Sequence, residues 1–181
     1  MRRALTVLLF ALLLIAPLGL SAKNRDPLTA VEVDQLREAA QDPETRMKLF
    51  VDFAGARLLA VEQLRADPKL GENRGQRIHD LLTDFLSICE SLEDNLDMYS
   101  RQHADLRKPL KHAIEAYTNG QLRLRTLKES SKPDPKAEAE FKEYDFVLES
   151  ASDAVNGGLE STREMLDEQN KRKQEEKKKK K

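Results

Sequence analysis

Six carboxylates crowd one short segment of the sequence, from His79 to Asp97, with no lysine or arginine among them. Several are four residues apart, as Asp80 and Asp84 are, and this spacing places two carboxylates on one face of a helix. Hard divalent cations bind such oxygen ligands. The segment is therefore a weak candidate metal site, formed by Asp80, Asp84, Glu90, Glu93, Asp94 and Asp97.

The same segment also fits the polar side of a long helix, predicted from about Arg74 to Gln102. Apolar residues recur there in the a and d positions of a heptad, and none of the six carboxylates falls on that seam. We favour a solvated face, because charged residues are rarely buried without a partner. The basic helix that follows in the sequence would then lie beside this acidic one and fix its register. The a positions are Ile78, Phe85, Leu92 and Tyr99.

Two helices are predicted before this one. Thr29 and Glu32 fit a capping box, which begins a short helix over residues 30–40. Asp42 and Pro43 then supply an N-cap and a first helical residue for a helix that runs to about Ala66. We expect the buried stripe of that second helix to consist of Leu49, Phe53, Ala56, Ala60 and Leu64.

Two more helices follow the acidic one. The first is expected to begin between Asp105 and Pro109, and the second at Pro135, after a Pro-Asp-Pro turn. Asn119-Gly120 and Asn156–Gly158 disfavour a helix on propensity, but the apolar spacing keeps its phase, so we predict continuous helices. The two stripes are Leu106, Leu110, Ala113, Tyr117, Gly120, Leu124 and Leu127, and then Phe141, Tyr144, Leu148, Ala151, Val155, Gly158, Thr162 and Met165.

These elements predict an all-α fold over residues 23–170. The chain is 35% charged, only 5% aromatic and without tryptophan, which suits long amphipathic helices. Short loops make consecutive helices antiparallel. We therefore expect an antiparallel up-down four-helix bundle with coiled-coil-like heptads and a short N-terminal helix against it. In its last hairpin, Gly158 would lie near Leu106, and Ala151 near Ala113.

The N-terminal segment, residues 1–22, is typical of a secretory signal peptide. Two arginines precede an apolar run, and small residues up to Ala22 offer a cleavage site. The run is shorter than the roughly 20 residues that span a membrane. The sequence thus predicts an exported protein, periplasmic or secreted, with an uncleaved N-terminal anchor as the alternative.

The C-terminal segment, residues 171–181, has eight basic and two acidic residues. Because it offers nothing apolar to bury, we expect a disordered tail. Residues 23–170 hold 21 basic and 30 acidic residues, which argues against nucleic-acid binding through the fold. The tail instead could solubilise the protein, fold back on its own acidic helix, or reach an anionic envelope surface through Lys177, Lys178, Lys179, Lys180 and Lys181.

Enzyme and cofactor motifs are missing from the sequence. It contains no Glu-x-x-His motif for a di-iron bundle, no nucleophile elbow and no glycine-rich phosphate loop. Cys89 is the only cysteine, so neither an intramolecular disulfide nor a thiolate zinc site can form. We expect Cys89 to act as a small, half-buried apolar residue, and we predict no enzyme and no cofactor.

Two family resemblances accompany these features. The acidic runs within residues 79–97 resemble those of the PhoU family of phosphate-signalling helical bundles, which would imply bound metal; that family has two bundles and is cytosolic. The signal peptide, "LTAVEVDQLREAAQDP" and "RGQRIHDLLTDFLSICESLEDNLD" resemble a group of uncharacterised exported bacterial helical proteins. The second resemblance implies a fold and an export route but no activity.

We therefore predict an exported, non-enzymatic helical bundle that serves as a binding or scaffolding module in the cell envelope. Its partner would be an unidentified protein or a second copy of the chain. The alternative is a divalent-metal-binding bundle that uses the surface carboxylates of the acidic helix.

Overall fold

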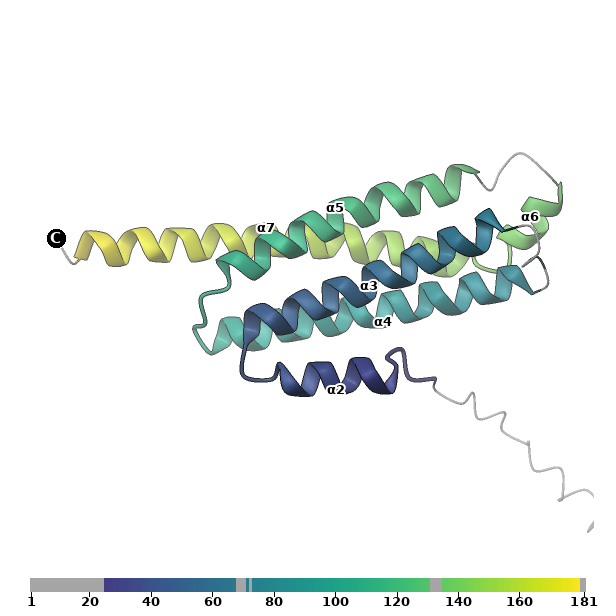
Figure 1. Cartoon of the computed structure of the whole chain (residues 1–181). Helices are drawn as coiled ribbons and strands as arrows, with labels where there is room; N and C mark the ends of the chain where they lie inside the picture. Colours follow the sequence, from purple (N-terminus) through teal and green to yellow (C-terminus); the bar gives the residue numbers. More distant parts are fainter. Residues whose placement is uncertain (1–24, 68–70, 72, 131–134, 180–181) are drawn as a thin grey trace, which may run out of the picture.

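The computed structural model describes residues 25–67, 71, 73–130 and 135–179, and every regular element in these ranges is a helix. The predicted all-α class is confirmed. Two short helices, α2 (Ala30–Glu38) and α6 (Pro135–Phe141), flank a body of long ones (Figure 1). The long helices are α3 (Pro43–Ala66), α4 (Arg74–Arg101), α5 (Arg107–Ser130) and α7 (Asp145–Lys179). The predicted signal peptide, residues 1–22, lies outside the described residues.

The predicted starts of α2 and α3 are confirmed. The Thr29 hydroxyl accepts a hydrogen bond from the Glu32 backbone N–H at 3.3 Å, and the Glu32 carboxylate accepts one from the Thr29 N–H at 2.7 Å. Asp42 caps α3 by accepting from the Glu44 N–H at 3.1 Å, with Pro43 as the first helical residue. Each cap satisfies backbone donors that the first turn of a helix leaves free.

Each long helix packs against two others: α3 against α4 and α5, and α7 against α5 and α4. Consecutive helices α4 and α5 therefore occupy opposite corners, and the predicted charge pairing between them is wrong. Two bases of α5 pair with α3 instead: Lys108 with Glu44 and Arg123 with Glu62. Exposed ion pairs contribute only about 0–1 kcal/mol each, so the burial of apolar faces decides which helices become neighbours.

The register between α5 and α7 also differs from the prediction. Gly158 lies against Tyr117, and Gly120 lies against Val155, so Gly158 is about three helical turns away from Leu106. The shift arises because the chain leaves the helix after Phe141 and resumes it at Asp145. No proline or glycine marks this break. It is a tertiary effect: α6 turns aside to pack on the start of α4, where Arg74 and Glu140 form an ion pair at 2.7 Å.

The predicted buried stripes agree with the structure in some helices and not in others. All seven residues of the stripe predicted for the fourth helix are buried: six lie in α5, and Leu106 directly precedes it. Both α5 and α7 run without interruption through the Asn-Gly segments, as predicted. In α3 the predicted stripe is wrong, since only Phe53 and Leu64 of it are buried. Helix α3 carries apolar residues on several sides, so spacing alone did not identify the buried side. Its core residues are Met47, Phe50, Phe53, Ala54, Leu58, Val61 and Leu64.

The lysine-rich segment predicted to be disordered is helical as far as Lys179, and this expectation is corrected. Figure 1 shows the end of α7 extending beyond the other helices. Lysine, glutamate and glutamine have good helix propensity. Glu168 pairs with Arg172 at 2.5 Å over a spacing of four, and cations complement the C-terminal end of the helix dipole. Lys180 and Lys181 lie outside the described residues.

Candidate functional site

The candidate metal-binding carboxylates Asp80 and Asp84 lie together, but around an arginine. Arg25 forms an ion pair with the Asp84 carboxylate at 2.6 Å and with the Asp80 carboxylate at 3.7 Å. Arg57 of α3 also approaches Asp84, at 4.0 Å. A guanidinium thus stands where a bridging cation would sit. The two carboxylates help to hold the segment before α2 on the body.

The other four carboxylates are spread along α4. Glu90 and Asp94 are exposed, Asp97 pairs with Arg101 at 3.8 Å, and Glu93 is half-buried. Within the ranges that the structure describes, no three His, Cys, Asp or Glu side chains are grouped so that they could hold a metal ion. The structure therefore does not bring the six predicted residues into one site.

Glu93 differs from the other five carboxylates because its half-buried side chain contacts a core residue of another helix. Its carboxylate accepts a hydrogen bond from the Tyr117 hydroxyl at 3.2 Å, beside Gly158 of α7. Burial raises the pKa of Glu93, and the charges of Asp97, Asp94 and Glu90 act in the same direction, against the hydrogen bond from Tyr117. Glu93 is therefore a destabilising charge at neutral pH.

Replacing Glu93 with glutamine is expected to stabilise the protein at pH 7. A carboxyl group whose pKa is raised by folding favours the folded state below its unfolded pKa of about 4.3, and that contribution is lost as the pH rises through the folded value. Glu93→Gln keeps an acceptor for Tyr117 without the charge. Urea denaturation should show a gain at pH 7 that shrinks toward pH 4. Exposed Glu160→Gln is the control, and a loss of stability in Glu93→Gln at pH 7 would contradict this assignment.

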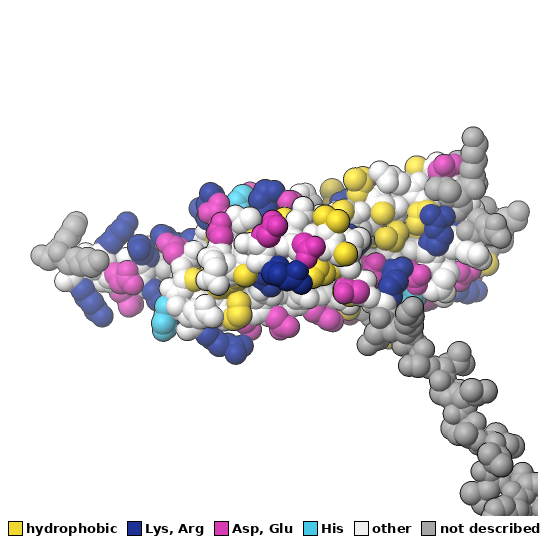
Figure 2. Space-filling model, turned by 60° about the horizontal axis from the view of Figure 1, so that its bottom comes forward, with side chains coloured by type: hydrophobic (Ala, Val, Ile, Leu, Met, Phe, Trp, Pro, Cys, Tyr) yellow, Lys and Arg dark blue, Asp and Glu magenta, His cyan; other side chains and the backbone are white. Residues whose placement is uncertain are grey.

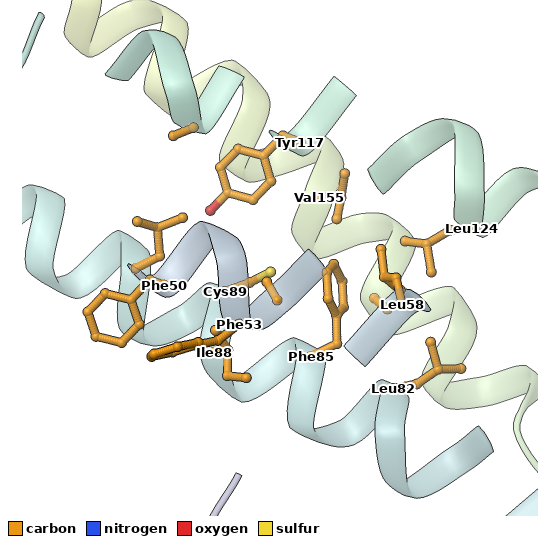
Figure 3. Packing of buried hydrophobic residues seen from close by; sticks show 14 of the residues in the cluster. Phe50, Phe53, Leu58, Leu82, Phe85, Ile88, Cys89, Tyr117, Leu124 and Val155 are labelled. Atoms are coloured by element: carbon orange, nitrogen blue, oxygen red, sulfur yellow. The ribbon is translucent and has the colours of Figure 1, made fainter. Parts of the chain in front are cut away.

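An apolar groove of about 470 Å³ lies between α3 and α5. Small residues line its walls, and its floor is formed by Phe85, Cys89 and Leu92 of α4. Figure 3 shows Leu58, Phe85 and Cys89 in the same part of the core, below Tyr117. The wall residues include Ala54, Gly55 and Ala56 of α3 and Ala116 and Gly120 of α5.

The groove continues along the two helices. A second hollow of about 190 Å³ shares Leu58 and Arg123 with the first and reaches Leu127. Figure 2 shows hydrophobic side chains gathered where the C-terminal halves of α3 and α5 lie. Leu59, at the rim of the groove, is an apolar residue that is 48% exposed to solvent. Arg123 is the cation at the rim, and it pairs with Glu62 at 2.6 Å.

Cys89 gives the floor of the groove an apolar surface. Its side chain is 2% exposed, more deeply buried than predicted, and burial together with Glu93 and Glu90 raises the pKa of the thiol to about 12. The thiol is therefore protonated at neutral pH and lacks the reactivity of a thiolate. It behaves as a small apolar group.

Sequence reasoning missed the groove, although one signal for it exists. The run Ala54-Gly55-Ala56 sits in the middle of α3, and Gly55 has open space where a Cβ would be. Because these three residues have small side chains or none, this part of α3 fills little of the space beside it. Only the pairing of this run with Ala116 and Gly120 on α5 turns it into a hollow, and that pairing depends on the tertiary arrangement.

Two further findings concern membrane spans and similarity to known proteins. No helix within the described ranges is long and apolar enough to cross a membrane. No family model, no curated protein and no solved structure matches the chain, so neither family resemblance gains support from these comparisons and the function must be argued from the groove itself.

Proposed function

We propose that this protein is an exported, non-enzymatic binding module of the cell envelope, with its long helices in an antiparallel up-down four-helix bundle. Its ligand is an elongated apolar molecule, such as a fatty acyl chain, bound between α3 and α5. The apolar groove open to the core is the single observation that carries this proposal. The export signal of residues 1–22 supplies the compartment.

The depth and lining of the groove favour an acyl chain over a partner helix. Its floor belongs to the core of α4, and its volume falls in the usual range of small-molecule sites, about 300–1,000 Å³. Small-molecule sites commonly lie between the helices of a bundle. Each methylene buried in such a groove contributes about 0.8 kcal/mol. Arg123 at the rim pairs with Glu62 at 2.6 Å and donates to the Gly55 carbonyl at 3.3 Å, so an anionic head group would have to replace Glu62 as its partner.

Filling the groove tests the proposal. Gly55→Leu adds a side chain where no atom lies within 4 Å of the new Cβ, so it should fill the groove without straining the fold. We expect the chain from Lys23 to bind dansyl-undecanoate with enhanced fluorescence, and Gly55→Leu to weaken binding by at least about tenfold.

The matched control is Gly157→Leu, because Gly157 is exposed on α7 and also has open space around its Cβ. It should bind the probe as the unsubstituted chain does. Equal binding by all three proteins, or binding by none, would contradict the proposed function. Circular dichroism and urea denaturation would show that each variant is folded.

A further inference from the structure

The end of the molecule from which α7 projects is strongly basic. Six of the nine residues from Lys171 to Lys179 are lysine or arginine, and all nine are exposed. The first turns of α5 lie at the same end: Arg107 lines a hollow with Arg172 and Lys173 of α7. Figure 2 shows Lys and Arg side chains on this extension and on the body beside it.

Some of these cations are already paired, but the outermost are not. Arg107 pairs with Asp105 at 2.5 Å, and Lys173 with Glu176 at 3.9 Å; Lys108 and Arg172 are paired with Glu44 and Glu168. Five lysines at this end have no carboxylate of the described residues within 4.0 Å: Lys111, Lys171, Lys177, Lys178 and Lys179. Their charge is available to an external anion.

We propose that this basic end binds the surface of a membrane that contains anionic phospholipid, with the long axis of the bundle pointing away from it. The cations of α7 and α5 meet at one end, while the remainder of the chain is acidic. A flat anionic surface can meet that end alone, whereas a long nucleic acid would also run along the acidic body and be repelled. This proposal does not depend on the groove.

The chemistry of the extension predicts how it binds. Residues 171–179 include no apolar side chain, so the helix has no face to insert among acyl chains and attraction must be electrostatic. Each lysine near an anionic surface contributes about fivefold in affinity. The attraction should vanish at about 1 M salt, where the screening length is about 3 Å.

Vesicle sedimentation of the chain from Lys23 to Lys181 tests the proposal. Vesicles of one part phosphatidylglycerol to three parts phosphatidylcholine should carry the protein down at low salt, and vesicles of phosphatidylcholine alone should not. Lys177→Gln, Lys178→Gln and Lys179→Gln together should weaken binding by about 100-fold. The matched variant with arginine at these three positions keeps the charge and should bind as before.

Three results would overturn the proposal. They are no sedimentation with the anionic vesicles, equal binding by the glutamine variant, and binding that persists at high salt. Retention on single-stranded DNA at physiological salt with no binding to the vesicles would assign the basic end to a nucleic acid instead. None of these results would affect the probe-binding experiment on the groove, because the residues that line the groove on α3, α4 and α5 are not residues of the basic end.

Discussion

Alanine substitutions at two consecutive glycines of α7 are expected to change stability in opposite directions. Alanine favours a helix interior over glycine by about 1 kcal/mol. At Gly157 the new Cβ meets no atom within 4 Å, so Gly157→Ala should gain that amount. At Gly158 the Cβ would lie 2.6 Å from the Tyr117 ring and 2.5 Å from the Glu93 carboxylate. Because Tyr117 is buried, Gly158→Ala should cost about 2 kcal/mol net.

Urea denaturation of both variants measures the difference. The pair tests the register of α5 against α7, since only that register places Gly158 on the Tyr117 ring. If both substitutions stabilised the protein equally, Gly158 would not face Tyr117, and the packing of α7 described above would be wrong.

A second large effect is expected at Arg57, which holds α2 on the body. Its side chain is only 12% exposed, and it donates two hydrogen bonds of 2.6 Å to the Glu32 carboxylate and one of 2.7 Å to the Pro27 carbonyl. Arg57→Met would leave Glu32, itself 13% exposed, without its partner. Removing one member of a buried pair costs about 3 kcal/mol.

The double variant Arg57→Met with Glu32→Met separates charge from packing. It should recover much of the loss, because it leaves no unpaired charge. Arg37→Met is the control, since Arg37 is exposed and its pair with Asp34 is worth little. The measurement is the free energy of unfolding in urea. If Arg57→Met cost no more than Arg37→Met, Arg57 would not anchor α2.

The same pair predicts a pH dependence of stability. Arg57 lowers the pKa of Glu32, mainly through its hydrogen bond, against the effect of burial. A carboxylate with a lowered pKa stabilises the fold above its unfolded pKa, and the contribution is lost as the pH falls through the folded value. The Arg57→Met variant should therefore lose less stability on acidification than the unsubstituted chain.

The sequence predicted best those helices with a single apolar face. Every predicted stripe residue within α5 is buried, because most of its apolar residues fall on one side of the helix; Leu122, 65% exposed, lies outside the stripe. In α3 the separation fails, since Leu49 and Val51 are only partly buried and Leu59 is exposed. The break after Phe141 has no proline or glycine to mark it in the sequence. It accompanies the packing of α6 on the start of α4, where Arg74 and Glu140, far apart in the chain, form an ion pair.

The groove was harder to predict than the helices, because it forms where two neighbouring helices lack large side chains. The density of charge in the acidic segment predicts a metal site, yet Asp80 and Asp84 form ion pairs with Arg25. Arg25 is far from both in the sequence, so local spacing does not reveal it as their partner. The groove forms where Gly55 and Gly120 leave room on helices that are not consecutive. The groove can therefore be predicted only once it is known that α3 packs against α5.

The most direct test of the proposed function is a methyl NMR titration of the chain from Lys23 with oleate. If an acyl chain enters the groove, the methyl signals of Leu58 and Leu59, which line it, should shift and saturate. The methyl signals of Leu36 in α2, which does not line the groove, should stay in place. Shifts at Leu36 equal to those at Leu58, or no saturable shift at either groove leucine, would contradict the account.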